Sequence, residues 1–177
     1  MLSDLQKRKL TRHFEFYDID SNGYIERDDY ILFAERLARV RGWPVGTARY
    51  EMIVGRFLAE WEVLRSFADE GNDHRISLEE WYAYHSYVLF IDVKHRAGEK
   101  DIISTIFETL DANGDGFITE SEFKAFYSIY DAPQELASEI FDRIDIIWII
   151  ARGELAIPLC NLIVGDNPIT VDVDPVK

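Results

Sequence analysis

Two stretches of the chain place an oxygen-bearing side chain at every second position, and this pattern limits the fold more than any other feature of the sequence. The first stretch, DIDSNGYIERDD, spans residues 18–29 and is called loop 1; the second, DANGDGFITESE, spans residues 111–122 and is called loop 3. Each has acids or amides at its first, third and fifth positions, glycine at the sixth, isoleucine at the eighth and an acid at the twelfth. This spacing is typical of a turn that surrounds a hard cation with oxygen atoms.

Each position in the pattern has its own physical reason. An ion of the size of Ca²⁺ takes roughly six to eight oxygen ligands at 2.3 to 2.6 Å, so short side chains on alternate residues can converge on it together with one backbone carbonyl. Glycine at the sixth position permits the sharp turn. We therefore predict two bound Ca²⁺ ions. The candidate metal ligands are Asp18, Asp20, Asn22, Tyr24 (carbonyl), Glu26 and Asp29 in loop 1, and Asp111, Asn113, Asp115, Phe117 (carbonyl), Thr119 and Glu122 in loop 3.

Apolar residues precede and follow both loops at helical spacing. The positions eight, four and one residues ahead of the loops hold Leu10, Phe14 and Tyr17 for loop 1, and Ile103, Phe107 and Leu110 for loop 3. The matching positions after the loops hold Tyr30, Phe33 and Leu37, and Phe123, Phe126 and Tyr130. Each loop is therefore expected to lie between two amphipathic helices, which predicts an all-α fold.

This helix–loop–helix arrangement resembles the EF-hand family, and the resemblance implies that the loops pair and that more copies exist. A further copy is DEGNDHRISLEE, residues 69–80, called loop 2, with Ile76 at the eighth position and Glu80 at the twelfth. The residues that repeat the outgoing helix pattern are Trp81, Tyr84 and Val88.

Two registers are open for loop 2. Leu64 and Phe67 are one residue out of phase with a loop that begins at Asp69, and they fit better with a loop that begins at Ala68 and contains an extra residue. In either register Gly71 or His74 replaces an expected feature. We expect loop 2 to be a structural partner without an ion, although its three acids, Asp69, Asp73 and Glu80, leave a weak site open.

A fourth copy departs further from the loop pattern than loop 2 does. Pro133 is expected to begin a helix capped by Asp131, and that helix is expected to lead to Asp145. Its apolar residues Ala137, Phe141 and Ile144 hold the same offsets as in the other copies. The segment that follows, IIWIIARGELAI, lacks oxygen ligands at the required positions, so no metal is expected there.

The chain is thus predicted to form four EF-hand units in two paired lobes, residues 1–92 and 100–165, with a polar joint at 92–101 and a C-terminal tail at 166–177. Over nearly all of residues 1–165 it resembles the sarcoplasmic calcium-binding protein and calerythrin family. The resemblance implies compact, cup-like packing of the lobes and a role in intracellular calcium buffering. Members of that family usually keep a metal loop in the fourth unit, and this sequence departs from them there.

Charge and composition argue against several kinds of partner. The formal net charge of −14 disfavours nucleic acids and anionic membranes and favours cations. The single cysteine, Cys160, lies in an apolar stretch and fits a reducing compartment. The N-terminus lacks an apolar signal core, and no run of about 18 apolar residues could span a bilayer. We expect a cytoplasmic monomer that binds metal ions.

Among functional classes, a calcium buffer is favoured. A sensor that binds a protein partner usually exposes a Met-rich groove, but this chain has only Met1 and Met52. A carrier of a small hydrophobic ligand is the other alternative, with a cavity lined by Trp43, Trp61, Trp81, Trp148 and His85. No enzymatic activity is expected, because the four histidines are scattered and no serine or cysteine has the context of a nucleophile.

Loop 1 closes on Asp29 where loop 3 closes on Glu122. Aspartate is one methylene shorter and can bind through one oxygen, which moves the site toward the six ligands that Mg²⁺ requires. We therefore predict that loop 1 discriminates less against Mg²⁺ than loop 3. Glu26 could bind the ion directly or through water, whereas Thr119 is expected to hold a water molecule.

Overall fold

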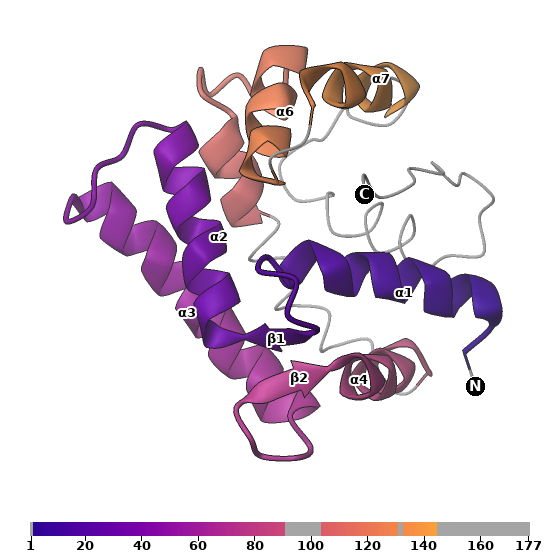
Figure 1. The fold of residues 1–177 in the computed structure, drawn as a ribbon. Coiled ribbons are helices and arrows are strands. Elements are labelled where there is room, and N and C mark those ends of the chain that lie inside the picture. Colours follow the sequence, from indigo (N-terminus) through magenta and orange to yellow (C-terminus); the bar gives the residue numbers. More distant parts are fainter. Residues whose placement is uncertain (1, 91–103, 131–132, 145–177) are drawn as a thin grey trace.

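The computed structural model describes residues 2–90, 104–130 and 133–144, and all structural statements here concern those residues. As predicted, the fold is built mainly of helices (Figure 1). The N-terminal elements are α1 (Asp4–Tyr17), β1 (Tyr24–Glu26), α2 (Arg27–Val40), α3 (Ala48–Ala68), β2 (Arg75–Ser77) and α4 (Leu78–Phe90). They are followed by a helical segment at 104–110, α6 (Glu120–Tyr127), the 3-10 helix η2 (Ser128–Tyr130) and α7 (Gln134–Ile144).

Loops 1, 2 and 3 each lie between two helices. Loop 1 connects α1 to α2, loop 2 connects α3 to α4, and loop 3 connects the segment 104–110 to α6. The outgoing helices begin inside the loops, because the ninth and twelfth residues cap each other. In loop 3, for example, the Thr119 amide donates to Glu122 Oε2 at 2.8 Å, and the Glu122 amide donates to Thr119 Oγ1 at 3.3 Å.

Loops 1 and 2 pair through a short antiparallel sheet. Strands β1 and β2 align Ile25 with Ile76, and both isoleucines are fully buried. The eighth positions of the two loops therefore meet, as their spacing predicts. Because of this pairing, loop 2 braces loop 1 whether or not loop 2 itself holds an ion.

The structure settles the register of loop 2. Helix α3 ends at Ala68, and Asp69 caps it with nearly the same backbone angles as Asp18 has at the end of α1, with φ near −76° and −75°. The register that begins at Ala68 is therefore wrong. Trp61 and Ala68 occupy the buried positions eight and one residues ahead of the loop, whereas Phe67, used for the alternative alignment, is half exposed.

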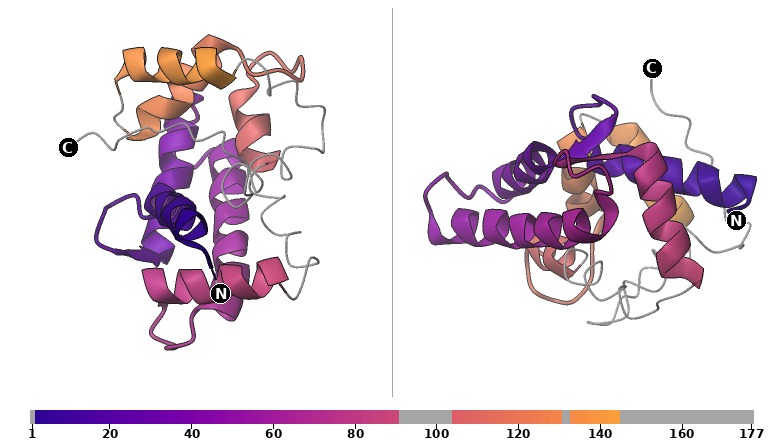
Figure 2. Two further views of the ribbon diagram at one scale, coloured as in Figure 1. Left: turned by 90° about the vertical axis from the view of Figure 1, so that its right-hand side faces the viewer. Right: turned by 90° about the horizontal axis from the view of Figure 1, so that it is seen from below.

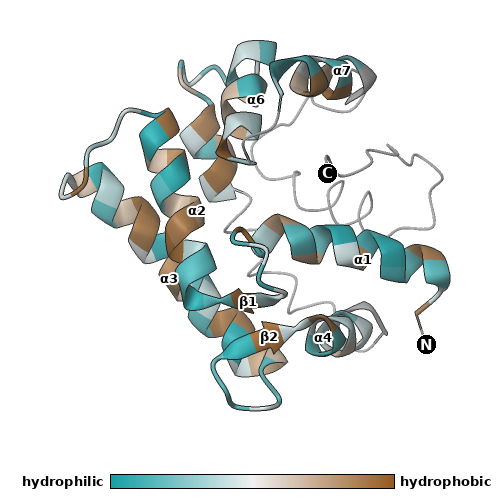
Figure 3. Cartoon of the chain, viewed as in Figure 1, coloured by the Kyte–Doolittle hydropathy of each residue, from teal (hydrophilic) through white to brown (hydrophobic). Residues whose placement is uncertain are grey.

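The core follows the predicted apolar positions. Those buried around loop 1 are Leu10, Phe14, Tyr17, Tyr30, Phe33 and Leu37, and those buried around loop 3 are Phe107, Leu110 and Phe123. Helices α2 and α3 run side by side and pack closely (Figure 2). Their surfaces alternate between hydrophilic and hydrophobic strips, as expected for amphipathic helices (Figure 3).

Only the entry helix of the predicted fourth unit is described. Helix α7 begins at Gln134, directly after Pro133, and Ala137 is fully buried. The other predictions for the C-terminal part lie outside the described residues: the Asp131 cap, Asp145 and the segment after it, Trp148, Cys160, the joint at 92–101 and the tail at 166–177. The number of four units therefore stays a prediction.

Candidate metal centres

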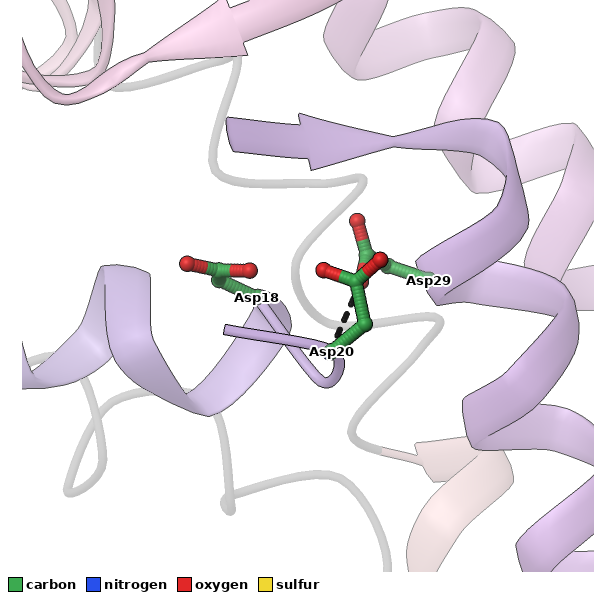
Figure 4. Close-up of side chains that lie close together, drawn as sticks. All are labelled: Asp18, Asp20 and Asp29. Carbon is green, nitrogen blue, oxygen red and sulfur yellow. Dashed lines mark hydrogen bonds between the residues drawn. The ribbon is translucent and has the colours of Figure 1, made fainter. Parts of the chain in front are cut away.

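Loop 1 brings three carboxylates together. Asp18 ends α1, Asp20 lies in the turn, and Asp29 lies in the first turn of α2. One oxygen atom from each of the three lies within 4.8 Å of the others (Figure 4). Asp18 and Asp29 are buried, with 7% and 3% of their surface exposed, while Asp20 is exposed.

The electrostatics of this cluster favour a cation. The pKa of Asp29 is raised to about 6, mainly by burial; the Asp20 and Asp18 carboxylates also raise it, whereas amide hydrogen bonds oppose the shift. Burial also raises the pKa of Asp18. Carboxylates that are buried beside like charges are costly to ionise, and a divalent cation removes that cost. The donor set, all oxygen and mostly anionic, fits a hard ion such as Ca²⁺ or Mg²⁺.

The three loops share one hydrogen-bond framework. In each, the first acid accepts bonds from the amides of the fifth and sixth residues, at 2.9 to 3.2 Å. The twelfth acid accepts from the ninth amide at 2.8 Å and from an amide near the start of the loop at 2.7 to 3.0 Å. The backbone itself therefore turns the first and last acids toward the centre of each loop.

Loop 3 is more open than loop 1. Asp111 and Glu122 are half-buried, while Asn113, Asp115 and Thr119 are exposed. Asp115 accepts from Asn113 Nδ2 at 2.7 Å and from the Phe117 amide at 2.8 Å. Within the described ranges, the loop 1 group is the one set of three or more acidic, histidine or cysteine side chains whose ligand atoms lie so close together.

The other predicted ligands of loop 1 lie near its acids. Asn22 Nδ2 donates to Asp20 Oδ2 and to Glu26 Oε2, both at 3.0 Å, so the third, fifth and ninth side chains meet. Tyr24 lies at the start of β1, and its ring stacks beneath the Arg75 guanidinium at 4.3 Å. All six predicted positions of loop 1 therefore belong to one connected region around the turn.

Loop 2 carries its own positive charge. Arg75 Nε donates to Asp73 Oδ2 at 2.8 Å, which lowers the pKa of that carboxyl group. Gly71 offers no side-chain oxygen at the third position, and His74 adopts φ 65° at the position where loops 1 and 3 have glycine. Sequence reasoning missed the role of Arg75, although an arginine two residues after an acid of a metal loop could have indicated it.

A second feature that the sequence pattern did not indicate is a tyrosine pair beside loop 1. Tyr17 directly precedes Asp18 and Tyr30 directly follows Asp29, and their rings stack with centroids 5.6 Å apart and planes 8° apart. The pair therefore joins the two ends of the loop on the core side of the carboxylates.

The aromatic residues proposed for a ligand cavity do not all come together. Trp81 and His85 are buried and in contact, with ring centroids 4.2 Å apart, and Trp61 contacts Tyr30. Trp43 lies instead beside Arg41 and Arg49, each 5.7 Å from its ring. Trp148 is outside the described residues.

Comparisons with known proteins agree with this geometry. The model of the EF hand family matches residues 102–127, which contain loop 3. Calerythrin of Saccharopolyspora erythraea is 24% identical over 152 residues, covering 82% of this chain and 83% of calerythrin. Loop 3 and the helices on either side of it thus match the EF-hand family.

Two further relatives point the same way. Sarcoplasmic calcium-binding proteins I, III and IV of Branchiostoma lanceolatum are 27% identical over 131 residues, covering 71% of this chain and 70% of theirs. The structure of a calcium-binding protein of Streptomyces coelicolor aligns with a TM-score of 0.74 at 20% identity, covering 92% of this chain and 99% of that one, and shows the same fold. The chain is thus similar to a group of calcium-binding proteins. None of the helices in the described ranges is long and apolar enough to cross a bilayer.

Proposed function

We propose that this EF-hand protein binds two Ca²⁺ ions, one in loop 1 and one in loop 3, and acts as an intracellular calcium buffer. The observation that carries the proposal is the convergence of Asp18, Asp20 and Asp29, two of them buried, inside a loop with the required spacing. Ca²⁺ would supply the positive charge that this cluster lacks.

In loop 1 the ion would be held by the three aspartates, Asn22, the Tyr24 carbonyl and Glu26. The amides of Ile19 and Glu26 donate to the two oxygens of Asp29, at 3.0 and 2.8 Å, and orient this carboxylate toward the loop before an ion binds. Such preorganisation reduces the entropy lost on binding.

Loop 3 is proposed as the second site because its spacing and its hydrogen-bond framework match those of loop 1. The ligands would be Asp111, Asn113, Asp115, the Phe117 carbonyl, Glu122 and a water molecule held by Thr119. Glu122 comes from the first turn of α6, and its longer side chain can offer both oxygens. Loop 2 and the fourth unit are proposed to remain without ions.

Selectivity is proposed to differ between the two sites. Asp29 reaches less far than Glu122, so loop 1 should tolerate the smaller coordination number of Mg²⁺ better. Ca²⁺ titrations with and without millimolar Mg²⁺ test this point. We expect Mg²⁺ to weaken Ca²⁺ binding at loop 1 and to affect loop 3 little; the reverse pattern would overturn the assignment.

A buffer rather than a sensor is proposed because the helices offer little methionine for an adaptable groove. Met52 lies on α3 and is 45% exposed, and it is the single methionine in the described residues. We further infer that the protein works as a cytoplasmic monomer without enzymatic turnover. Binding of a hydrophobic dye with and without Ca²⁺ distinguishes the two roles: a buffer should show little change, whereas a large Ca²⁺-dependent increase would indicate a sensor.

A further inference from the structure

The two loops proposed to bind ions do not pair with each other. Loop 1 pairs with loop 2 through β1 and β2, and loop 2 lacks a ligand at Gly71. Strand pairing within one lobe therefore gives no direct path from loop 1 to loop 3. Among the described residues, the contact between the lobes is what links loop 1 to loop 3.

On the side of loop 1, this contact begins next to the metal ligands. The stacked pair of Tyr17 and Tyr30 adjoins the first and last acids of the loop. Phe16 packs on Tyr17 at 5.3 Å and on Phe33, one helical turn after Asp29, also at 5.3 Å. A change in the separation of Asp18 and Asp29 would therefore move aromatic rings that lie at the lobe boundary.

On the side of loop 3, the equivalent residue reaches the same place. Phe126 follows Glu122 by four residues, just as Phe33 follows Asp29. The rings of Phe33 and Phe126 meet at 6.4 Å, and both also contact Phe16, at 5.3 and 6.1 Å. Tyr130 completes the group, 5.1 to 6.1 Å from the other three rings. We call Phe16, Phe33, Phe126 and Tyr130 the interlobe aromatic cluster.

Polar contacts hold the same boundary together. Arg36 on α2 donates to the Ile129 carbonyl, and the Tyr130 hydroxyl donates to the Phe16 carbonyl at 3.5 Å. Arg56 on α3 pairs with Glu108, ahead of loop 3, at 3.1 Å. Helices α2 and α6 accordingly lie close together (Figure 1). The two lobes are thus joined by oriented contacts as well as by packing.

We propose that loops 1 and 3 are coupled through the interlobe aromatic cluster, so that an ion in either loop raises the affinity of the other loop. The proposal rests on the proposed binding of one Ca²⁺ in each loop. An ion would restrain the twelfth acid and with it the first turn of the outgoing helix. The aromatic ring four residues later, Phe33 or Phe126, belongs to that helix and contacts the other lobe, so its position would be restrained as well. Packed interfaces favour discrete arrangements over gradual deformation. Ordering of the helix after one loop should therefore also order the helix after the other loop.

The test measures the affinity of each loop with the other loop disabled. Calorimetric Ca²⁺ titrations compare the wild type with Glu122→Gln, which disables loop 3, and with Asp29→Asn, which disables loop 1. Because coupling is reciprocal, each disabled loop should weaken the other by the same factor, about fivefold or more. Phe126→Leu should reduce that factor to less than about twofold.

The matched control is Phe67→Leu, the same substitution at a half-exposed position of α3 outside the cluster, which should leave the factor unchanged. If circular dichroism shows that Phe126→Leu fails to fold, Tyr130→Leu replaces it, with the same expected loss of coupling.

Equal affinities in wild type and single-loop variants would overturn the coupling while leaving two-site binding intact. If Phe126→Leu kept the coupling factor, or if Phe67→Leu lost it, the assignment of the coupling to the interlobe aromatic cluster would also be overturned. Absence of any Ca²⁺ binding would overturn the proposed function itself.

Discussion

Asp29 and Glu122 occupy the same position in their loops but differ in length and surroundings. Asp29 is buried and lies against two other carboxylates, whereas Glu122 is half-buried at the start of α6. Both accept hydrogen bonds from the loop backbone through both oxygens. Their contributions to ion binding should therefore respond differently to acid and to substitution.

The first prediction concerns pH at loop 1. Without a metal, the pKa of Asp29 is raised to about 6, so protons compete with the ion below that pH. Ca²⁺ affinity of loop 1 should be full above pH 6 and should fall by up to about tenfold for each pH unit below it. Titrations of the Glu122→Gln variant between pH 7.5 and 5 measure loop 1 alone. A constant affinity across this range would contradict the assigned environment of Asp29.

The second prediction separates loop 3 from loop 2. Glu122→Gln removes a negative charge and the paired oxygens, so it should abolish Ca²⁺ binding at loop 3 and reduce the stoichiometry from two ions to one. Glu80→Gln makes the same change at the twelfth position of loop 2 and should leave the stoichiometry at two. Calorimetry measures both variants; loss of an ion in Glu80→Gln would show that loop 2 binds metal.

At the scale of elements, the two-stranded sheet explains how loop 2 can support loop 1. The fully buried pair of Ile25 and Ile76 joins β1 to β2, and Arg75 stacks on Tyr24 across the same sheet. The salt bridge between Arg75 and Asp73 gives loop 2 a fixed cation of its own. Loop 2 can therefore hold its shape and support loop 1 in the absence of bound metal.

The third prediction follows from this support. Ile76→Ala leaves a cavity under the sheet and should lower the free energy of unfolding of the metal-free protein by about 2 to 4 kcal/mol. It should also weaken Ca²⁺ binding at loop 1, although residue 76 belongs to loop 2. Val63→Ala, at a residue that is 45% exposed, is the control and should change stability by less than about 0.5 kcal/mol. If denaturant unfolding gave equal losses of unfolding free energy for the two substitutions, loop 2 would not support loop 1 in the way proposed.

Spacing in the sequence predicted the elements that depend on local pattern. The helical class, the burial of the eighth-position isoleucines and the buried offsets around loop 1 are confirmed. Around loop 3, Phe107, Leu110 and Phe123 are buried, Phe126 and Tyr130 are partly buried, and Ile103 lies outside the described residues. The register of loop 2 was not predicted, because it was aligned on Leu64 and Phe67, and Phe67 is half exposed. Near the loop, this helix contributes Trp61, Leu64 and Ala68 to the core. Contacts between distant residues, such as Arg75 with Tyr24 and Phe33 with Phe126, depend on tertiary packing, which periodicity does not encode.

At the scale of the whole molecule, both the acidic composition and the loop geometry favour the binding of cations. The chain carries 33 acidic and 19 basic residues. Seven of the 33 acids are predicted ligands in the two loops, where their mutual repulsion should destabilise the folded state until an ion binds. Metal binding and folding stability should therefore be linked.

The fourth prediction quantifies this link. A free Ca²⁺ concentration of 100 times the dissociation constant should add about 2.7 kcal/mol per independent site. For two sites in a chain of this size, Tm should rise by about 10 to 20 °C relative to protein in chelator. Differential scanning calorimetry measures the shift, and the Glu122→Gln variant should retain about half of it. The same Tm with Ca²⁺ and with chelator would contradict the link.

The most direct test of the central claim is the calorimetric stoichiometry of Ca²⁺ binding to the wild-type protein. Two ions per chain are predicted, one lost in Glu122→Gln and the other in Asp29→Asn. A stoichiometry of zero would contradict the assignment of both loops, and three or four would contradict the proposal that loop 2 and the fourth unit remain without metal.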